Sequence, residues 1–413
     1  MRKRIVILGA GFGGITAALR LARLRRRGAL PNYYAITLVN NTSYHLYTPA
    51  LYEIASIPHT ETLLPAVKRS ICIPLTDIIE RFPEIELRGG TVNEIDPARR
   101  ALTLASGETI DFEYAVIALG SETNFSDIPG AAARALPLKT FPDAVRLRNR
   151  IEELLRARRR RQRVSVVIAG GGATGVEFAA EAVNFICRIR QRATLRQCNT
   201  DVTLIEASEE ILPGFAAAII ARARERLGDL GILIRSGTTI SRITEKDVIV
   251  KGRRRIPYHI FVWAGGVRGV AVLRTLRLPL DGKGRIVVDA FLRAAPGVYA
   301  IGDDASVRNP HTNRYLPGNV PVAETEAKLA ARNIVAEIRG EPLRPITMLR
   351  EYPFILAVGG KYAIANLVVW WFAGFFGWVV KQLVELRYLT FILPPARALR
   401  VWLQAIRAAI SND

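Results

Sequence analysis

The sequence has little cysteine and little histidine, which limits the chemistry it can support. Its three cysteines, Cys72, Cys187 and Cys198, form no C-x-x-C pair. A sparse, odd count argues against a disulfide framework and is typical of a reducing compartment. The chain has only 4 histidines, and none lies at a useful metal-ligand spacing from a cysteine. We therefore expect no metal site.

Acidic residues are also scarce relative to basic ones. Against 58 Lys and Arg, the 413 residues include only 37 Asp and Glu, so the formal net charge is +21. This excess favours an anionic partner such as lipid headgroups or nucleic acid, although arginines on a solvated surface would give the same total. Arg156–Arg163 ("RARRRRQR") is consistent with lipid contact, nucleic-acid binding or a solvated helix end, and the last is favoured because no nucleic-acid-binding fold accompanies it. We expect no nucleic-acid partner.

A glycine loop follows the first apolar run. Ile5–Leu8 is typical of a strand buried on both faces, and "GAGFGG" comes directly after it, before the helical stretch Ile15–Leu24. This order predicts a strand, a G-x-G-x-x-G loop and a helix. Gly9 permits the tight turn, Gly11 lets the backbone approach a pyrophosphate, and Gly14 lets the helix pack on the strand.

The same pattern recurs in the middle of the chain. The apolar strand Val164–Ile168 leads into "GGGATG" at Gly170–Gly175 and then into the helix Val176–Ile189. The next strand ends at Glu206, whose carboxylate favours a free ribose 2′-hydroxyl and so predicts NADH rather than NADPH. In the first unit the matching strand ends at Asn40, an amide without charge. Two such units predict two dinucleotides held face to face.

Four stretches carry a family resemblance. "VYAIGDDA" at Val298–Ala305 resembles the A-x-G-D motif of two-dinucleotide-binding flavoprotein reductases, in which the Asp bonds the flavin ribityl chain. "ITLVNNTSYHLYTPALYEIAS" (Ile36–Ser56), "GGGATGVEFAAE" (Gly170–Glu181) and "VWAGGVRG" (Val262–Gly269) are similar to motifs of the type II NADH dehydrogenases, the single-chain NADH:quinone oxidoreductases. All four occur in the family's order.

The resemblance implies an α/β fold with two Rossmann-like dinucleotide-binding domains, the second inserted in the first, followed by a C-terminal amphipathic membrane-binding region. It places the FAD-binding domain at residues 1–118 and 285–342, the NADH-binding domain at 119–284, and the membrane-anchoring, quinone-access region at 343–413. It implies hydride transfer from NADH to FAD and then two electrons to a membrane quinone, without proton pumping. The expected location is peripheral, on the cytoplasmic side of the cell membrane at an anionic lipid surface, with a homodimer possible.

The resemblance also assigns residues to three sites. The FAD contacts are Gly9, Gly11, Phe12, Gly13, Gly14, Asn40, Asn41, Thr48, Val92, Ala118, Gly120, Gly302, Asp303 and Ala323. The NADH contacts are Gly170, Gly172, Ala173, Thr174, Gly175, Glu177, Glu206, Gly265 and Gly266. Glu177 is the candidate catalytic residue near the nicotinamide and the quinone, although a carboxylate favoured by its helix dipole would explain it equally. The candidate quinone contacts are Pro321, Val322 and Glu324.

Two features keep alternatives open. The stretch Tyr44–Pro49 lacks the cysteines that disulfide reductases need beside the flavin, which excludes thiol–disulfide chemistry. The family's Ala-Gln motif is replaced by Val320-Pro321 or by Ala323-Glu324, depending on the alignment. The alternatives are a soluble NADH-dependent reductase with a ferredoxin-type acceptor, a relative of sulfide:quinone oxidoreductase, and a slowly reacting NADH-responsive binding protein.

The C-terminal tail is apolar and aromatic. No charged residue lies between Lys361 and Lys381, a length that approaches a membrane span. Its asparagine and glycines argue instead for a strand at Tyr362–Val368 and a helix from about Trp370. Ala396–Ile410 predicts a basic amphipathic helix that lies in a membrane interface, with packing on the protein's own core or in a dimer as the alternative. Its apolar face comprises Leu399, Trp402, Leu403, Ile406 and Ile410.

Overall fold

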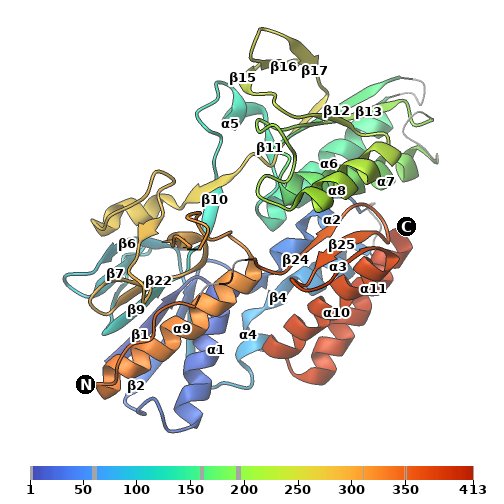
Figure 1. Ribbon diagram of the computed structural model, residues 1–413. Coiled ribbons are helices and arrows are strands. Elements are labelled where there is room, and N and C mark those ends of the chain that lie inside the picture. The colour runs from blue at the N-terminus through green and yellow to red at the C-terminus, as the bar shows by residue number, and fades with distance from the viewer. Residues whose placement is uncertain are drawn as a thin grey trace.

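The computed structural model describes residues 3–57, 63–158, 162–191, 197–309, 311–347, 349 and 351–412. Figure 1 shows two α/β units at opposite ends of the molecule, with the C-terminal helices packed beside them. Each unit is built on a twisted sheet of apolar strands that carries helices.

The first unit is built on a six-stranded sheet in the order β21-β22-β9-β1-β2-β5, in which only the β21–β22 pair is antiparallel. Helices α1 and α9 pack against each other on this sheet. The bounds are β1 Lys3–Leu8, β2 Tyr34–Asn40, β5 Ile85–Gly89, β9 Tyr114–Ile117, β21 Arg293–Ala295, β22 Val298–Ala300, α1 Phe12–Arg26 and α9 Val320–Arg339.

The second unit has an all-parallel sheet in the order β11-β18-β12-β13-β14. Its bounds are β11 Leu136–Pro137, β12 Val164–Ala169, β13 Thr200–Ile205, β14 Leu233–Arg235, β18 Ile260–Trp263, α6 Phe141–Ala157, α7 Ala173–Arg190 and α8 Ala217–Asp229. Since strands before and after this unit share the first sheet, the expected insertion of one unit in the other is confirmed. Two strands, β10 (Ser121–Thr123) and β19 (Val267–Gly269), pair where the chain leaves and returns.

Smaller elements complete both units. The first carries β3 Tyr44–Leu46, β4 Cys72–Pro74, α2 Leu51–Ala55, α3 Leu63–Ile71, α4 Leu75–Ile79, β6 Val92–Asp96, β7 Ala101–Leu104 and β8 Thr109–Asp111. The second carries α5 Ala131–Arg134, β15 Ile240–Ile243, β16 Asp247–Val250 and β17 Arg255–Pro257. Two short strands, β20 (Ile286–Val287) and β23 (Ala305–Ser306), pair in parallel near the return of the chain.

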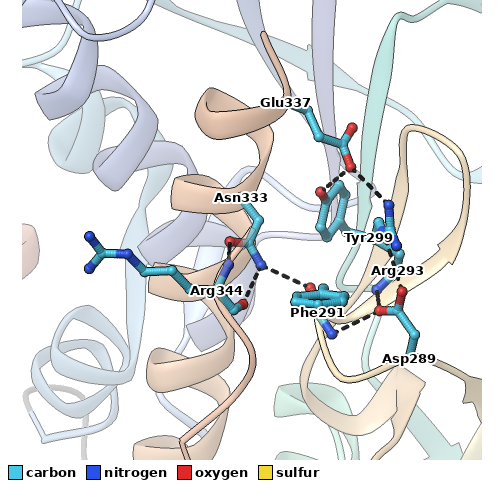
Figure 2. A network of polar contacts seen from close by, with 7 residues as sticks. All are labelled: Asp289, Phe291, Arg293, Tyr299, Asn333, Glu337 and Arg344. Atoms are coloured by element: carbon cyan, nitrogen blue, oxygen red, sulfur yellow. Dashed lines mark hydrogen bonds and ion pairs between the residues drawn. The ribbon is translucent and has the colours of Figure 1, made fainter. Parts of the chain in front are cut away.

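A polar network fastens the returning chain to α9 (Figure 2). The Tyr299 hydroxyl donates to Glu337 Oε1 at 2.7 Å, and Arg293 forms an ion pair with the same oxygen at 3.7 Å. The buried Asn333 side chain donates to the carbonyls of Phe291 and Arg344 and accepts from the Arg344 N–H. These contacts fix the segment after α9, which leads into the C-terminal region.

The C-terminal region combines a small sheet with two helices. Its elements are β24 Phe354–Ala357, β25 Ala363–Asn366, β26 Trp371–Gly374, α10 Phe375–Ile392 and α11 Pro395–Asn412. The prediction of a strand at Tyr362–Val368 is confirmed, but the prediction of a helix from about Trp370 is wrong. A turn closed by the Leu367 N–H to the Trp370 carbonyl returns the chain as β26, because aromatic residues suit a strand paired with β25.

Helix α11 matches the amphipathic prediction in extent, but part of the predicted apolar face packs on the protein itself. The Trp402 indole N–H donates to the Gln382 carbonyl of α10 at 2.8 Å, so this ring packs on the protein rather than pointing outward. Ala398 and Ala405 are buried on the same side, while Leu399 and Leu403 are exposed. Among the described helices, none has both the length and the apolar composition that a membrane span requires.

Candidate functional site

The first glycine loop joins β1 to α1. Gly9 has φ +98°, and a Cβ there would lie 2.1 Å from the Ala118 carbonyl oxygen. A Cβ on Gly14 would lie 1.8 Å from the Gly9 carbonyl oxygen. Gly11 differs, because a Cβ there would meet no atom of the described residues within 4 Å. Two glycines are thus required by packing, and the third leaves open space above the loop.

The second glycine loop, between β12 and α7, repeats this geometry. Gly170 has φ +104°, and a Cβ there would lie 2.3 Å from the Ala264 carbonyl oxygen. A Cβ on Gly175 would lie 1.9 Å from the Gly170 carbonyl oxygen, whereas one on Gly172 would meet nothing within 4 Å in the described part of the chain. The two loops are built for the same type of ligand.

Both loops present an uncapped helix N-terminus. Gly11 and Gly172 are the N-cap residues of α1 and α7, and no described side chain accepts a bond there or places an acid in the first turn. By contrast, the side chains of Thr140 and Asn319 cap α6 and α9. Free N–H groups and the positive end of the helix dipole attract phosphate, so both loops fit a dinucleotide diphosphate.

The residues that end the second strand of each unit brace the loops. Asn40 Oδ1 accepts the Ala10 N–H at 2.9 Å. Glu206 Oε2 accepts the Gly171 N–H at 2.7 Å, and its Oε1 accepts the Ser208 N–H at 2.7 Å. The predicted ribose contacts therefore also hold the glycine loops in shape, a role that the sequence did not reveal.

The A-x-G-D segment lies beside the first loop. The Ser121 hydroxyl donates to Asp303 Oδ2, and Lys139 lies 3.7 Å from the same oxygen. The neighbouring Asp304 is fully buried and accepts the Gly120 N–H at 2.8 Å. Burial raises the pKa of Asp304 well above its usual range, against the bond from Gly120. Asp303 itself stays partly exposed.

The first turn of α9 meets both the loop and this segment. A Cβ on Gly13 would lie 3.8 Å from the Ala323 carbonyl oxygen, and one on Gly302 would lie 3.7 Å from the Ala323 Cβ. The Gly302 N–H donates to the buried Glu326 at 2.6 Å, and burial raises the pKa of that carboxyl to about 8. The structure therefore brings together five of the predicted flavin contacts: Gly9, Gly13, Gly14, Gly302 and Ala323.

A cluster of ionisable groups lies where α2, α7 and α10 meet. Lys381 Nζ binds Glu53 Oε1 at 2.8 Å, with only 14% of the lysine side chain exposed. Glu385 is buried on the same helix as Lys381, and Glu177 Oε1 accepts the Ala357 N–H at 3.3 Å. One cation thus faces three carboxyls contributed by segments far apart in the sequence.

The surroundings shift the pKa values in this cluster. Burial raises the pKa of Glu177 to about 8, although Ala357 and Lys381 oppose the shift. Burial also raises the pKa of Glu385 to about 7, again against Lys381. Burial alone would lower the pKa of Lys381, but Glu53 and Glu385 together outweigh it and raise that pKa. At neutral pH the lysine is charged and the carboxyl of Glu177 holds a proton.

A buried aromatic group links the first loop to α10. His45 Nδ1 donates to the Ala10 carbonyl at 2.8 Å, and the Tyr388 hydroxyl donates to His45 Nε2 at 2.9 Å. The Phe12 ring lies edge-on to His45 with centroids 4.9 Å apart. Burial lowers the pKa of His45 to about 4, so the ring stays neutral and keeps both bonds. Helix α10 is therefore tied through His45 to the first glycine loop.

Other predicted residues occupy more ordinary positions. Val92 is a buried core residue that starts β6, Asn41 is exposed, and Thr48 opens a short helical turn. Glu324 is nearly buried and pairs with Lys328 at 3.2 Å. Pro321 and Val322 lie in the first turn of α9. The predicted contacts Ala173, Thr174, Gly265 and Gly266 surround the second loop at the ends of α7 and β18.

The cysteines support the exclusion of thiol chemistry. All three are buried thiols outside any disulfide, and burial raises the pKa of the Cys72 thiol to about 11. A thiol of this pKa is protonated at neutral pH and is a poor nucleophile. The site described above contains none of them.

The chain is similar to known oxidoreductases over most of its length. Residues 3–327 match the family model described as pyridine nucleotide-disulphide oxidoreductase. The demethylphylloquinone reductase NdbB of Synechocystis sp. is 30% identical over 88% of this chain and 87% of its own length. The type II NADH:quinone oxidoreductase Ndh of Mycobacterium tuberculosis is 28% identical over 94% and 84%.

Solved structures share the fold. NDH2 from Plasmodium falciparum in complex with NADH superposes with a TM-score of 0.79 at 16% identity, covering 98% of both chains. The sulfide:quinone oxidoreductase of Aquifex aeolicus gives 0.78 at 19% identity, covering 94% of this chain and 91% of its own.

These likenesses and the paired loops define a flavoprotein that binds two nucleotides on two Rossmann-like units. The chain belongs to the pyridine nucleotide-disulphide oxidoreductase family, and within it to the type II NADH dehydrogenases, as the sequence motifs predicted.

Proposed function

We propose that the protein is an NADH:quinone oxidoreductase that binds FAD on the first glycine loop and NADH on the second. The observation that carries this proposal is the matched geometry of the two loops, each with an open middle glycine and an uncapped helix. Relatives named as quinone reductases support the acceptor class. The proposed FAD-binding domain is 1–118 and 285–342, and the NADH-binding domain is 119–284.

The chain's own groups would hold the two nucleotides. Gly11 and Gly172 leave room for the diphosphates, and Asn40 and Glu206 keep the loops in shape. Asp303 is placed to bind a ribityl hydroxyl, with Lys139 and Ser121 fixing its carboxylate. The flavin, when bound, supplies the hydride acceptor and the source of electrons for the quinone.

Glu177 is the proposed proton donor to the quinone. Burial raises the pKa of its carboxyl to about 8, so it holds a proton at neutral pH, and the residue as a whole keeps some exposure through which a quinone could reach it. Lys381 keeps the cluster close to electrical balance when a proton leaves. Pro321, Val322 and Glu324 remain proposed quinone contacts in the first turn of α9. No described helix spans a membrane, so we propose no proton pumping.

The C-terminal region, 343–413, is the proposed contact with an anionic lipid bilayer on its cytoplasmic side. The hairpin and the start of α10 expose large apolar side chains that a soluble surface rarely carries together: Val369 is 83% exposed, Trp370 69% and Phe376 73%. Helix α10 carries both the exposed Phe376 and the cluster residue Lys381, so a quinone in the bilayer would lie near the cluster that contains Glu177. A homodimer stays a prediction.

Two loop variants test the assignment of the nucleotides. Gly11→Ala fills the open space of the first loop and should give folded protein with little bound flavin. Gly172→Ala should leave flavin content unchanged and raise the KM for NADH. The two substitutions add the same methyl group, so each controls for the other. The assignment fails if Gly172→Ala loses flavin or if Gly11→Ala retains it.

A further inference from the structure

Five arginines gather on the first unit, beside the end of α10. Arg20, Arg23 and Arg27 follow one face of α1, at intervals of three and four residues. Arg81, just after α4, lies 6.0 Å from the Phe82 ring centroid, and Arg23 lies 5.6 Å from the same ring. Arg332 lies on α9, which packs against α1, and we call these five residues the arginine face. The pKa of Arg23 is lowered by burial and by the charges of Arg81, Arg20 and Arg27. Burial, Arg332 and Arg27 likewise lower the pKa of Arg20.

Within the described part of the chain, the arginine face has no acidic partner. None of its five members forms an ion pair with a carboxylate among the residues that the structure describes. The neighbouring Arg26, by contrast, is neutralised by Glu84 at 2.8 Å. Arg27, Arg81 and Arg332 are exposed. Like charges held close together without carboxylates to neutralise them repel one another, and a bound anion would relieve that repulsion.

The arginine face is continuous with the C-terminal helices. Arg23 donates to the Phe391 carbonyl of α10 at 3.1 Å, and its guanidinium lies 4.6 Å from the Phe391 ring centroid. Lys328 Nζ of α9 lies 5.9 Å from the centroid of the same ring. The Phe391 ring is therefore flanked by one cation from α1 and one from α9.

The outward side of α10 changes character along its length. It exposes Phe375 and Phe376 in its first turn, Leu383 in the middle, and then Arg387 near its end. The arginine face begins where this apolar stripe stops. A membrane interface has the same order, since acyl chains meet apolar side chains and headgroups meet the basic residues around them.

We propose that the arginine face binds the headgroups of anionic phospholipids and is a second membrane contact, outside the C-terminal region. The proposal rests on the proposed membrane docking of that region and adds a site on the first unit. It gives the docked enzyme a fixed orientation, because α1 and α10 would meet the bilayer together.

The test uses the full-length protein and vesicles of phosphatidylcholine, with and without phosphatidylglycerol, in about 0.1 M salt, where charges act over about 10 Å. The patch variant carries Arg27→Gln, Arg81→Gln and Arg332→Gln. The control variant carries Arg253→Gln, Arg254→Gln and Arg255→Gln, which removes three exposed arginines at β16–β17, at the other end of the molecule (Figure 1). NADH oxidation with a water-soluble acceptor checks that both variants are folded.

The patch variant should partition into anionic vesicles on the order of a hundredfold more weakly than the wild type, at about fivefold for each arginine removed. It should bind neutral vesicles as the wild type does, and the control variant should lose little. Equal losses in the two variants would show an effect of net charge alone and overturn the proposal. Unchanged vesicle binding of the patch variant would also overturn the proposal. The same holds if the patch variant keeps its vesicle binding and loses only the binding of a DNA duplex, measured in parallel. Wild-type protein that binds neither vesicle would refute the membrane docking itself, and this proposal with it.

Discussion

Glu177→Gln is expected to slow quinone reduction and to remove the decline of its rate at alkaline pH. NADH oxidation with a one-electron acceptor should continue at the wild-type rate. The physical basis is the raised pKa of Glu177, about 8, which burial causes against the opposing effects of Ala357 and Lys381. A carboxyl whose pKa is raised holds its proton below that value and loses it as pH rises. Quinone reduction consumes protons, so the supply from Glu177 should fail above about pH 8.

The size of the effect follows from the titration. With a pKa of about 8, Glu177 is roughly nine-tenths protonated at about pH 7 and one-tenth protonated at about pH 9. Wild-type quinone turnover should therefore fall about tenfold across that interval. Glutamine cannot donate the proton, so the variant should be slower by ~100-fold or more at neutral pH, a usual loss for a general acid. Its remaining rate should be flat with pH.

The assay is steady-state turnover with a short-chain quinone, measured across the pH range beside a one-electron acceptor that needs no proton. Glu181→Gln is the matched control, since Glu181 lies one turn further along α7 and braces the Gly360 N–H at 3.0 Å. A Glu177→Gln enzyme with wild-type turnover and the wild-type pH profile would refute the proposed proton donation.

Three further predictions concern the loops and the cluster. Glu206→Ala removes two charge-assisted bonds to the second loop, each ~1.5–3 kcal/mol, and should raise the KM for NADH at least tenfold with little change in flavin content; an unchanged KM would contradict this role. Gly14→Ala places a methyl group 1.8 Å from the Gly9 carbonyl, so thermal unfolding should show a markedly less stable protein, and a wild-type melting temperature would be inconsistent with the loop geometry. Lys381→Met leaves Glu53 without its cation and should cost ~3 kcal/mol in urea unfolding, a loss that a second change, Glu53→Gln, should largely restore. If the double variant is no more stable than Lys381→Met, the pair is not the cause.

The fold was predictable because its signals are local. Each glycine loop lies between an apolar strand and a helix, so each predicts a Rossmann-like unit. Because the A-x-G-D segment of the first unit follows the second loop, the second unit was predicted to be inserted in the first. The helices begin earlier than predicted, at Phe12 and Ala173, because the last glycine of each loop lies in the first helical turn. The strand at Trp371–Gly374 was missed because a charge-free aromatic run suits either a helix or a strand, and pairing with β25 decides between them.

The candidate site was predictable only where a motif marks it. Asn40 and Glu206 stood out in the sequence as ribose contacts, but their bonds to backbone N–H groups depend on the folded loop. The cluster around Lys381 draws on three distant segments, so no spacing reveals it. One signal was present in the sequence. Lys381 is the first charged residue after the long apolar stretch that begins beyond Lys361, and a lysine buried in apolar surroundings needs an acidic partner.

The central claim is that electrons pass from NADH to a quinone through a flavin held on the first loop. The most direct measurement mixes the purified protein with NADH in a stopped-flow instrument, follows the flavin absorbance band, and then adds a short-chain quinone. The account predicts that NADH bleaches the band and that quinone restores it rapidly. Bleaching without recovery on quinone would contradict the proposed acceptor, and no bleaching by NADH would contradict the account as a whole.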